Sequence, residues 1–173
     1  VELKGVEFKT SDEGNQFMVF HFEKEGKTLD HTEWKPRDED PTKLENKTLN
    51  QVKRVKHIIT KFIPEEKFVF EASDFKSFAE NTIKLLGDNY KGKKVRMKVV
   101  YNWSNYTALP NYVPFIEKME VTPTKLEILS IDKMKKDDAD KETVTSVNPL
   151  EEELPETGSI ESENTEGDDG LPF

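Results

Sequence analysis

The last 37 residues set the limit on what this chain can fold into. No aromatic residue occurs between positions 137 and 172, where Asp, Glu, Ser, Thr, Asn, Gly and Pro dominate. Such a stretch cannot bury enough apolar surface to offset the entropy that is lost when it is ordered. We therefore predict a folded domain at residues 1–136 and a disordered acidic tail at residues 137–173.

Charge is divided unevenly between these two parts. Residues 1–136 hold 25 Lys and Arg against 22 Asp and Glu, whereas residues 137–173 hold 1 against 13. The pI of about 5.0 for the whole chain would ordinarily argue against a nucleic-acid partner. Because almost all of the excess acid lies in the tail, the domain itself is mildly basic, and a nucleic-acid partner stays open.

The absence of cysteine excludes disulfides and thiolate metal sites and is compatible with a reducing cytosol. No stretch approaches the ~20 apolar residues of a membrane span. The first residues, Val1–Lys4, do not have the pattern of a signal peptide. We expect a soluble protein of the cytoplasm.

The first 34 residues have the pattern of a three-strand meander. Residues 3–9 and 17–23 look like strands, the second being rich in aromatic and branched side chains, and turn-forming residues separate them. A second turn at Glu25–Gly26 leads to a third strand at 27–34, which Pro36 ends.

A helical pattern follows the meander. From about Asn46 to Ile63 the apolar residues fall on one half of a helical wheel, and Pro64 ends the pattern. Residues 68–70, Phe-Val-Phe, then suggest a short strand.

A second helix is predicted at residues 75–86. Ser73 or Asp74 can cap its amino end, and Gly87 suits its carboxyl end. Residues 91–103 then alternate between apolar and basic side chains, which predicts a strand.

Two further strands are predicted, a returning strand at 112–121 and a short closing strand at 126–131. The resulting order is three strands, helices, and two or three strands. This is the order of an OB-fold, a five-stranded barrel whose helix lies between strands three and four. We therefore predict a mainly β domain with a helical insertion and an OB-fold barrel.

Basic and aromatic residues are interleaved along the predicted hairpin of residues 91–112. Cations that follow phosphates, together with rings on which unpaired bases stack, are what single-stranded nucleic acid requires. The candidate binding residues are Lys91, Lys93, Lys94, Arg96, Lys98, Tyr101, Trp103, Tyr106 and Tyr112. The alternative is that Tyr101 and Trp103 belong to the core and that the lysines form an ordinary solvated strand face.

Other candidates lie outside this hairpin. Trp34 and Lys35 stand at a strand end among polar neighbours and are added to the candidate binding residues. Phe20 and Phe22 are more typical of a strand core than of base stacking. The cations Arg54 and Lys61 fit an ordinary exposed helix face.

Enzymatic chemistry has little support in the sequence. The three histidines are scattered, and neither metal-ligand spacing nor a glycine-rich phosphate loop occurs. No catalytic residue, metal site or cofactor is predicted. A metal-dependent nuclease using Asp30–His31 or Asp38–Asp40 is the less favoured alternative, because charged runs beside prolines are usually solvated loops.

The carboxyl-terminal tip has an acidic run followed by an aliphatic residue, a proline and a terminal phenylalanine. This tip resembles that of the bacterial single-stranded-DNA-binding proteins, from which it differs in Gly170 and in a dispersed acidic run. The length, the helical insertion and the stretch Tyr106–Glu117 resemble phage-encoded single-stranded-DNA-binding proteins. The candidate partner-binding residues of the tip are Asp168, Asp169, Leu171, Pro172 and Phe173.

The resemblance implies a protein that coats single-stranded DNA during replication, recombination or repair. Phe173 would enter an apolar pocket on a partner protein, and Asp168 and Asp169 would engage its basic rim. The alternative is an adaptor whose OB-like barrel binds another polypeptide and whose acidic tail blocks nucleic acid.

Overall fold

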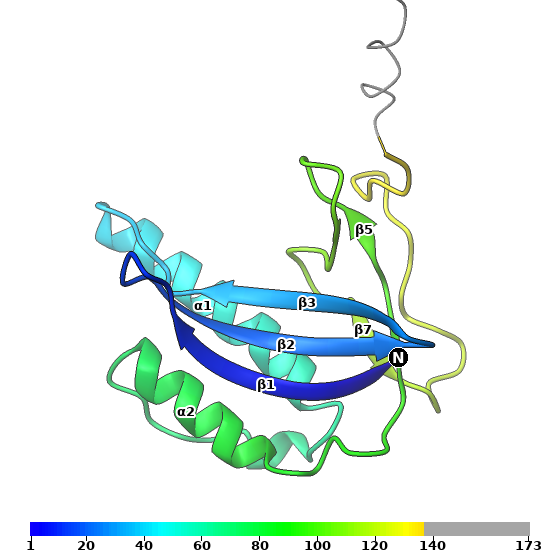
Figure 1. Cartoon of the computed structure of the whole chain (residues 1–173), viewed down its shortest axis with the longest axis horizontal. Helices are drawn as coiled ribbons and strands as arrows, with labels where there is room; N and C mark the ends of the chain where they lie inside the picture. Colours follow the sequence, from blue (N-terminus) through cyan, green and yellow to red (C-terminus); the bar gives the residue numbers. More distant parts are fainter. Residues whose placement is uncertain (137–173) are drawn as a thin grey trace, which may run out of the picture. The chain divides into compact units, whose positions relative to one another are not determined.

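The computed structural model describes residues 1–136, which belong to one compact unit, Val1–Asp137 (Figure 1). The predicted disorder of residues 137–173 and the five tip residues lie outside the described residues. The described part consists of three small β-sheets and two α-helices. None of its helices has the length and apolar character needed to cross a membrane.

The largest sheet is the meander that the sequence predicts. Strands β1 (Glu2–Thr10), β2 (Gln16–Lys24) and β3 (Lys27–Trp34) pair antiparallel in that order. Glu25 and Gly26 both have positive φ, 53° and 77°, as a two-residue hairpin with the right-handed strand twist requires.

Helix α1 (Pro41–Ile59) is displaced toward the amino end relative to the predicted span of 46–63. The charged run before it contains the cap: the Asp40 carboxylate accepts hydrogen bonds from two backbone N–H groups of the first turn. The helix ends at Ile59, because in a longer helix the ring of Pro64 would clash with the carbonyl of Thr60, four residues earlier. Ile63 is nevertheless buried in the core.

The predicted strand at 68–70 is wrong. A single 3₁₀ turn, η1 (Glu65–Lys67), leads into a loop. In this loop the Phe68 and Phe70 rings pack edge-on, with 5.2 Å between their centroids. Helix α2 (Phe75–Leu86) has the predicted bounds. Asp74 and Ser77 form a capping box at its amino end, and Gly87 adopts a positive φ of 47° at its carboxyl end.

The predicted strand at 91–103 is split into β4 (Val95–Met97) and β5 (Val100–Tyr101). β4 pairs with β7 (Ile116–Lys118), and β5 pairs with β6 (Thr107–Ala108). Of the predicted returning strand 112–121 only β7 forms, and residues 126–131 form no strand. Within the described residues the sheets are not joined into a closed barrel, so the OB-fold stays a prediction.

Both helices lie on the same side of the large sheet (Figure 1). The core lies between the sheet and the helices. Alternate residues of β2, including Phe20 and Phe22, point into this core with no more than 1% exposed surface. They are therefore core residues rather than base-stacking candidates. Backbone hydrogen bonds between Val1 and Val95, 2.8 and 2.9 Å long, connect the large sheet to β4.

Candidate nucleic-acid interface

The loop that joins β5 to β6 presents two aromatic rings to solvent. Trp103 is 90% exposed and Tyr106 is 72% exposed. The Asn102 side-chain oxygen accepts hydrogen bonds from the backbone N–H groups of Ser104 and Tyr106, both at 3.0 Å. Asn105 adopts a left-handed φ of 60° that closes the turn. The loop is thus a tight, internally bonded hairpin, and Trp103 does not belong to the core.

A second aromatic position lies at the end of β3. The Trp34 ring packs against Phe17, its cross-strand partner on β2, with 4.5 Å between ring centroids. Half of the Trp34 side chain, 51%, still faces solvent. Its backbone carbonyl accepts a hydrogen bond from Gln51 on α1, and the exposed Lys35 follows it. One face of the indole is therefore held while the rest is accessible.

A buried polar network fixes this end of β3 to α1. The Arg54 guanidinium donates two hydrogen bonds, 2.8 and 2.6 Å long, to the carboxylate of Glu33, which also accepts one from His31. Burial opposes the ionisation of Glu33, but the hydrogen bonds from Arg54 and His31 lower its pKa to about 2. Arg54 therefore neutralises an internal carboxylate and is not an open phosphate ligand.

Two of the predicted basic residues are also engaged within the domain. The Lys93 ammonium donates to the backbone carbonyl of Phe62 at 2.7 Å. Arg96 donates to the carboxylate of Glu117 at 2.6 Å and to two backbone carbonyls of the segment after β7. Lys93, just before β4, and Arg96, within β4, therefore connect this strand to distant parts of the chain.

Lys98 is the most buried of the predicted cations. Its ammonium lies 2.8 Å from the Tyr112 hydroxyl, from the Glu127 carbonyl and from the Asp132 carboxylate, and its side chain is 5% exposed. The Tyr112 hydroxyl donates to the same carboxylate. Burial opposes the ionisation of Asp132, but these partners lower its pKa to about 2. This placement argues against phosphate contacts by Lys98 and against base stacking by Tyr112.

The remaining predicted residues are accessible to different degrees. Lys91 forms an exposed ion pair with Asp88 at 2.9 Å, a contact that solvent screens strongly. Lys94 is exposed beside its backbone bridge to Glu2. Tyr101 is half-buried in β5. The predicted cluster is thus not one patch: its exposed rings lie on the β5–β6 hairpin, and its exposed lysines precede β4.

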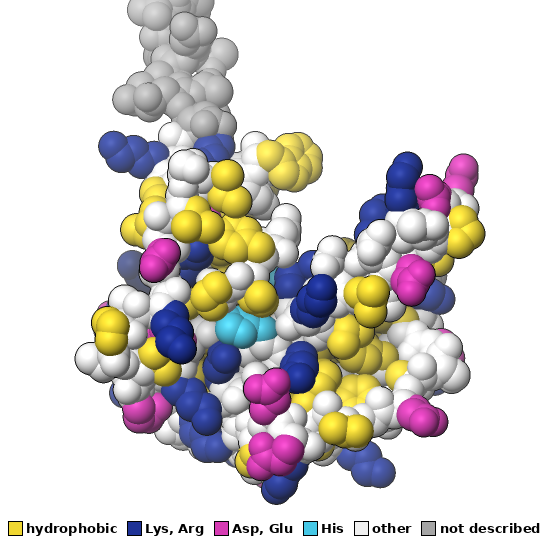
Figure 2. Space-filling view, turned by 180° about the vertical axis from the view of Figure 1, so that it is seen from behind, with side chains coloured by type: hydrophobic (Ala, Val, Ile, Leu, Met, Phe, Trp, Pro, Cys, Tyr) yellow, Lys and Arg dark blue, Asp and Glu magenta, His cyan; other side chains and the backbone are white. Residues whose placement is uncertain are grey.

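The molecule is hollowed on the face opposite to that of Figure 1, between the part that carries the hairpin and the amino-terminal part of α1. Figure 2 shows a histidine at the floor of this hollow and several Lys and Arg side chains around it. Lys118 and Lys125, which the sequence interpretation overlooked, line a pocket with Lys61 and His57. No local sequence signal predicts this grouping, because its members come from three separate segments.

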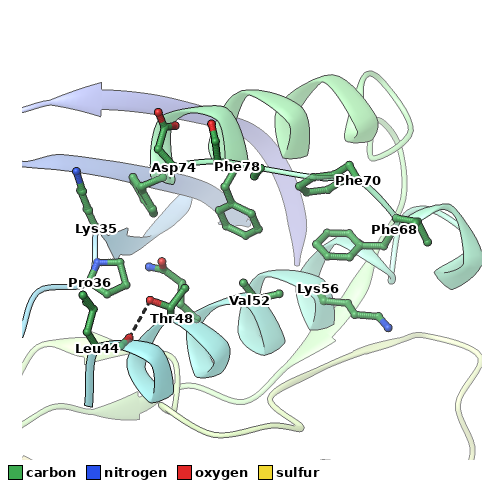
Figure 3. Close-up of a pocket in the computed structure, with 15 residues that line it drawn as sticks. Lys35, Pro36, Leu44, Thr48, Val52, Lys56, Phe68, Phe70, Asp74 and Phe78 are labelled. Carbon is green, nitrogen blue, oxygen red and sulfur yellow. Dashed lines mark hydrogen bonds between the residues drawn. The ribbon is translucent and has the colours of Figure 1, made fainter. Parts of the chain in front are cut away.

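A larger groove of about 800 Å³ opens between α1 and the loop before α2. Figure 3 shows Lys35 and Pro36 at one end and the Phe68 and Phe70 rings at the other, with Val52 between them on α1. Its lining is mainly apolar, which suits aliphatic or aromatic side chains better than phosphates. The groove forms because residues 68–74 are a loop, which the sequence pattern did not indicate.

The carboxylates considered for a metal-dependent nuclease have other partners. Asp30 accepts a hydrogen bond from His21 at 2.8 Å, Asp38 pairs with Lys47, and Asp40 caps α1. Within residues 1–136 no three His, Asp or Glu side chains are grouped as metal ligands.

Comparisons with protein-family models, curated proteins and solved structures find no match to this chain.

Proposed function

We propose that this protein binds single-stranded DNA through residues 1–136 with little sequence preference. The observation that carries this proposal is the pair of exposed rings, Trp103 and Tyr106, on a hairpin braced by its own hydrogen bonds. Large exposed apolar groups often mark a binding surface. Unpaired bases stack on such rings with roughly 1–3 kcal/mol each, whatever the base.

The other exposed candidates complete this interface. Trp34 offers a third ring on the large sheet, and the exposed Lys35, Lys91 and Lys94 supply charge for phosphates. Arg96 and Lys98 stabilise the domain and do not contact DNA, because their partners lie within the domain.

We further propose that the domain is an OB-fold whose barrel is incompletely hydrogen-bonded. The meander, the helices after β3 and the later short strands follow the OB-fold order, and the hairpin of Trp103 occupies the loop between strands four and five. That loop belongs to the nucleic-acid surface of many OB-folds. In the proposed role the protein coats DNA in the cytoplasm, in a bacterial or phage setting.

The tip is proposed to recruit replication, recombination or repair proteins. Its terminal Phe173 would fill an apolar pocket on the partner, with Asp168 and Asp169 at the basic rim. Pro172 would restrict the approach of the ring and so lower the ordering cost of binding.

The deciding experiment is a titration of oligo(dT) with the full chain and with Trp103→Ala and Tyr106→Ala. Each substitution is expected to weaken binding about 5- to 150-fold, the equivalent of one lost stack. Val69→Ala is the matched control, because Val69 is also highly exposed but lies in the loop before α2. Wild-type affinity in both ring variants, or no oligo(dT) binding by the wild-type chain, would refute the proposal.

A second candidate function, a protein-interaction adaptor, is favoured by the apolar groove between α1 and the loop before α2. Its lining of phenylalanines would accept apolar side chains of a polypeptide. A chain ending at residue 136 that is folded but does not bind single-stranded DNA would favour the adaptor over the DNA-binding protein.

A further inference from the structure

A small pocket lies where the carboxyl end of α1 meets β7 and the segment that follows it. Its volume is about 200 Å³, and its walls include His57, Lys61, Lys118 and Lys125. A single water needs only roughly 10–15 Å³ of such space, so the pocket has room for a polyatomic ion. It does not include Trp34, Trp103 or Tyr106.

Three lysines line this pocket, and none of them forms an ion pair with a carboxylate of residues 1–136. In the described part of the chain, none of Lys61, Lys118 and Lys125 has an acidic partner within 4 Å. The one acidic wall residue, Glu117, already accepts hydrogen bonds from Arg96, from Thr124 and from the Lys125 backbone. The pocket therefore carries an excess of positive charge.

The lysine charges act on one another. The pKa of half-buried Lys61 is lowered, first by burial and then by the nearby charges of Lys118 and Lys125. The charges of Glu65 and Glu117 offset this only in part, and each of these carboxylates has its own cation, Lys56 at 2.8 Å and Arg96 at 2.6 Å. A bound anion would remove the repulsion among the three ammonium groups, which is a physical reason for this pocket to attract one.

His57 fixes a wall of the pocket. Its Nε2 accepts hydrogen bonds from the backbone N–H groups of Phe115 and Ile116, at 3.3 and 3.4 Å. Burial and the charge of Lys61 lower the pKa of His57 to about 4, so the ring is neutral at pH 7. An accepting Nε2 leaves the proton on Nδ1. The histidine thus holds the start of β7 against α1 without adding charge.

We propose that this pocket binds a phosphate group through Lys61, Lys118 and Lys125. Lysine is a common phosphate ligand that acts as a point charge, and the oxygens of one phosphate group can accept hydrogen bonds from several ammonium groups. The source that fits the proposed function, on which this part of the inference rests, is a backbone phosphate of bound single-stranded DNA. Free inorganic phosphate is the other source of the same chemistry.

The first arm of the test measures oligo(dT) binding to the full chain at several salt concentrations. Lys61→Gln/Lys125→Gln is compared with Lys84→Gln, which removes an exposed lysine of α2 outside the pocket. The pocket variant is expected to lower the slope of log affinity against log salt by about 0.7 for each phosphate no longer neutralised. The control is expected to keep the wild-type slope.

The second arm measures the thermal midpoint in sodium phosphate against sodium chloride of equal ionic strength. Phosphate is expected to raise the midpoint of the wild-type chain but not that of the pocket variant. In chloride, the pocket variant is expected to melt no lower than the wild type, because it removes mutually repelling charges.

The two arms distinguish the sources. A change in slope assigns the pocket to the DNA path, whereas a phosphate effect with an unchanged slope assigns it to the free ion. If the wild-type chain binds no oligo(dT), the proposed function fails. The thermal midpoints in phosphate then decide alone whether the pocket binds a phosphate group. An unchanged slope together with no phosphate effect overturns the inference.

Discussion

Lys91 and Lys98 lie close together in the sequence, and each has an ammonium group within 2.9 Å of an aspartate. Their surroundings differ completely. The Lys91 pair stands in solvent, whereas the Lys98 pair is enclosed and shares its carboxylate with Tyr112. A charge pair that is removed from water costs much when one partner is lost, whereas an exposed pair contributes little.

Substituting the two lysines is therefore expected to separate stability from binding. Lys98→Met should lower the free energy of unfolding by about 3 kcal/mol, because it leaves the Asp132 carboxylate buried without its cation. Lys91→Met should leave urea unfolding unchanged and weaken oligo(dT) binding. Oligo(dT) affinity per folded molecule should be unchanged in Lys98→Met. A Lys98→Met variant with wild-type stability would contradict the buried pair.

At the scale of elements, one side chain adds two hydrogen bonds to the backbone of the β5–β6 hairpin. The side-chain oxygen of Asn102 accepts hydrogen bonds from the backbone N–H groups of Ser104 and Tyr106, which follow Trp103 in the loop. The backbone that carries the rings is thereby ordered before a ligand arrives, so less conformational entropy is lost on binding.

Asn102→Ala is expected to weaken oligo(dT) binding although both rings remain. The expected loss is about 0.5–1.5 kcal/mol per ring that must be ordered on binding, with a small effect on the thermal midpoint. Fluorescence titration measures the affinity, and Asn111→Ala, in the exposed loop before β7, is the control. Equal losses in the two variants would show that the hydrogen bonds of Asn102 do not prepare the hairpin.

Elements with local signals could be predicted from the sequence. The strand 27–34 and the helix 75–86 have the predicted bounds, because turns and capping residues mark their ends. The start of α1 was missed because its cap, Asp40, lies within a charged run that has the pattern of a solvated loop. The predicted strand at 68–70 failed because its phenylalanines pack on each other and on α2.

The candidate site could be predicted only in part, because some of its residues have partners that are distant in the sequence. An exposed ring such as Trp103 has no requirement for a distant partner, so its loop position was a usable signal. The partners of Arg96 and Lys98 lie more than twenty residues later in the sequence, at Glu117 and Asp132. The alternation of apolar and basic residues along one strand cannot reveal such distant pairs. The sequence therefore predicted more basic side chains available to DNA than the structure has.

At the scale of the whole molecule, the mildly basic domain and the strongly acidic carboxyl-terminal part suit different partners. In the proposed function the domain binds DNA and the tip binds proteins. Joining two binding parts in one chain raises the effective concentration of one partner near the other.

Deletion of Phe173 is expected to abolish capture of the partner proteins while leaving oligo(dT) affinity unchanged. The ring would supply the apolar anchor of the tip, and no domain residue is altered. Pull-down from a bacterial lysate measures the first effect, with Leu154→Ala as the control within the same acidic stretch. Undiminished capture of the same proteins after the deletion would exclude the tip as the recruiting element.

The way the chain leaves the domain has a mechanical consequence. After β7 the described chain forms no further strand, and it is held by the side chains of Arg96, Lys98 and Glu117 and by a backbone bond from Tyr101 to Lys133. A partner pulling on the carboxyl-terminal tip would load these contacts before it loads the large sheet. The Lys98 contacts would thus bear the force first, and their rupture would release residues after β7 while the meander stays folded.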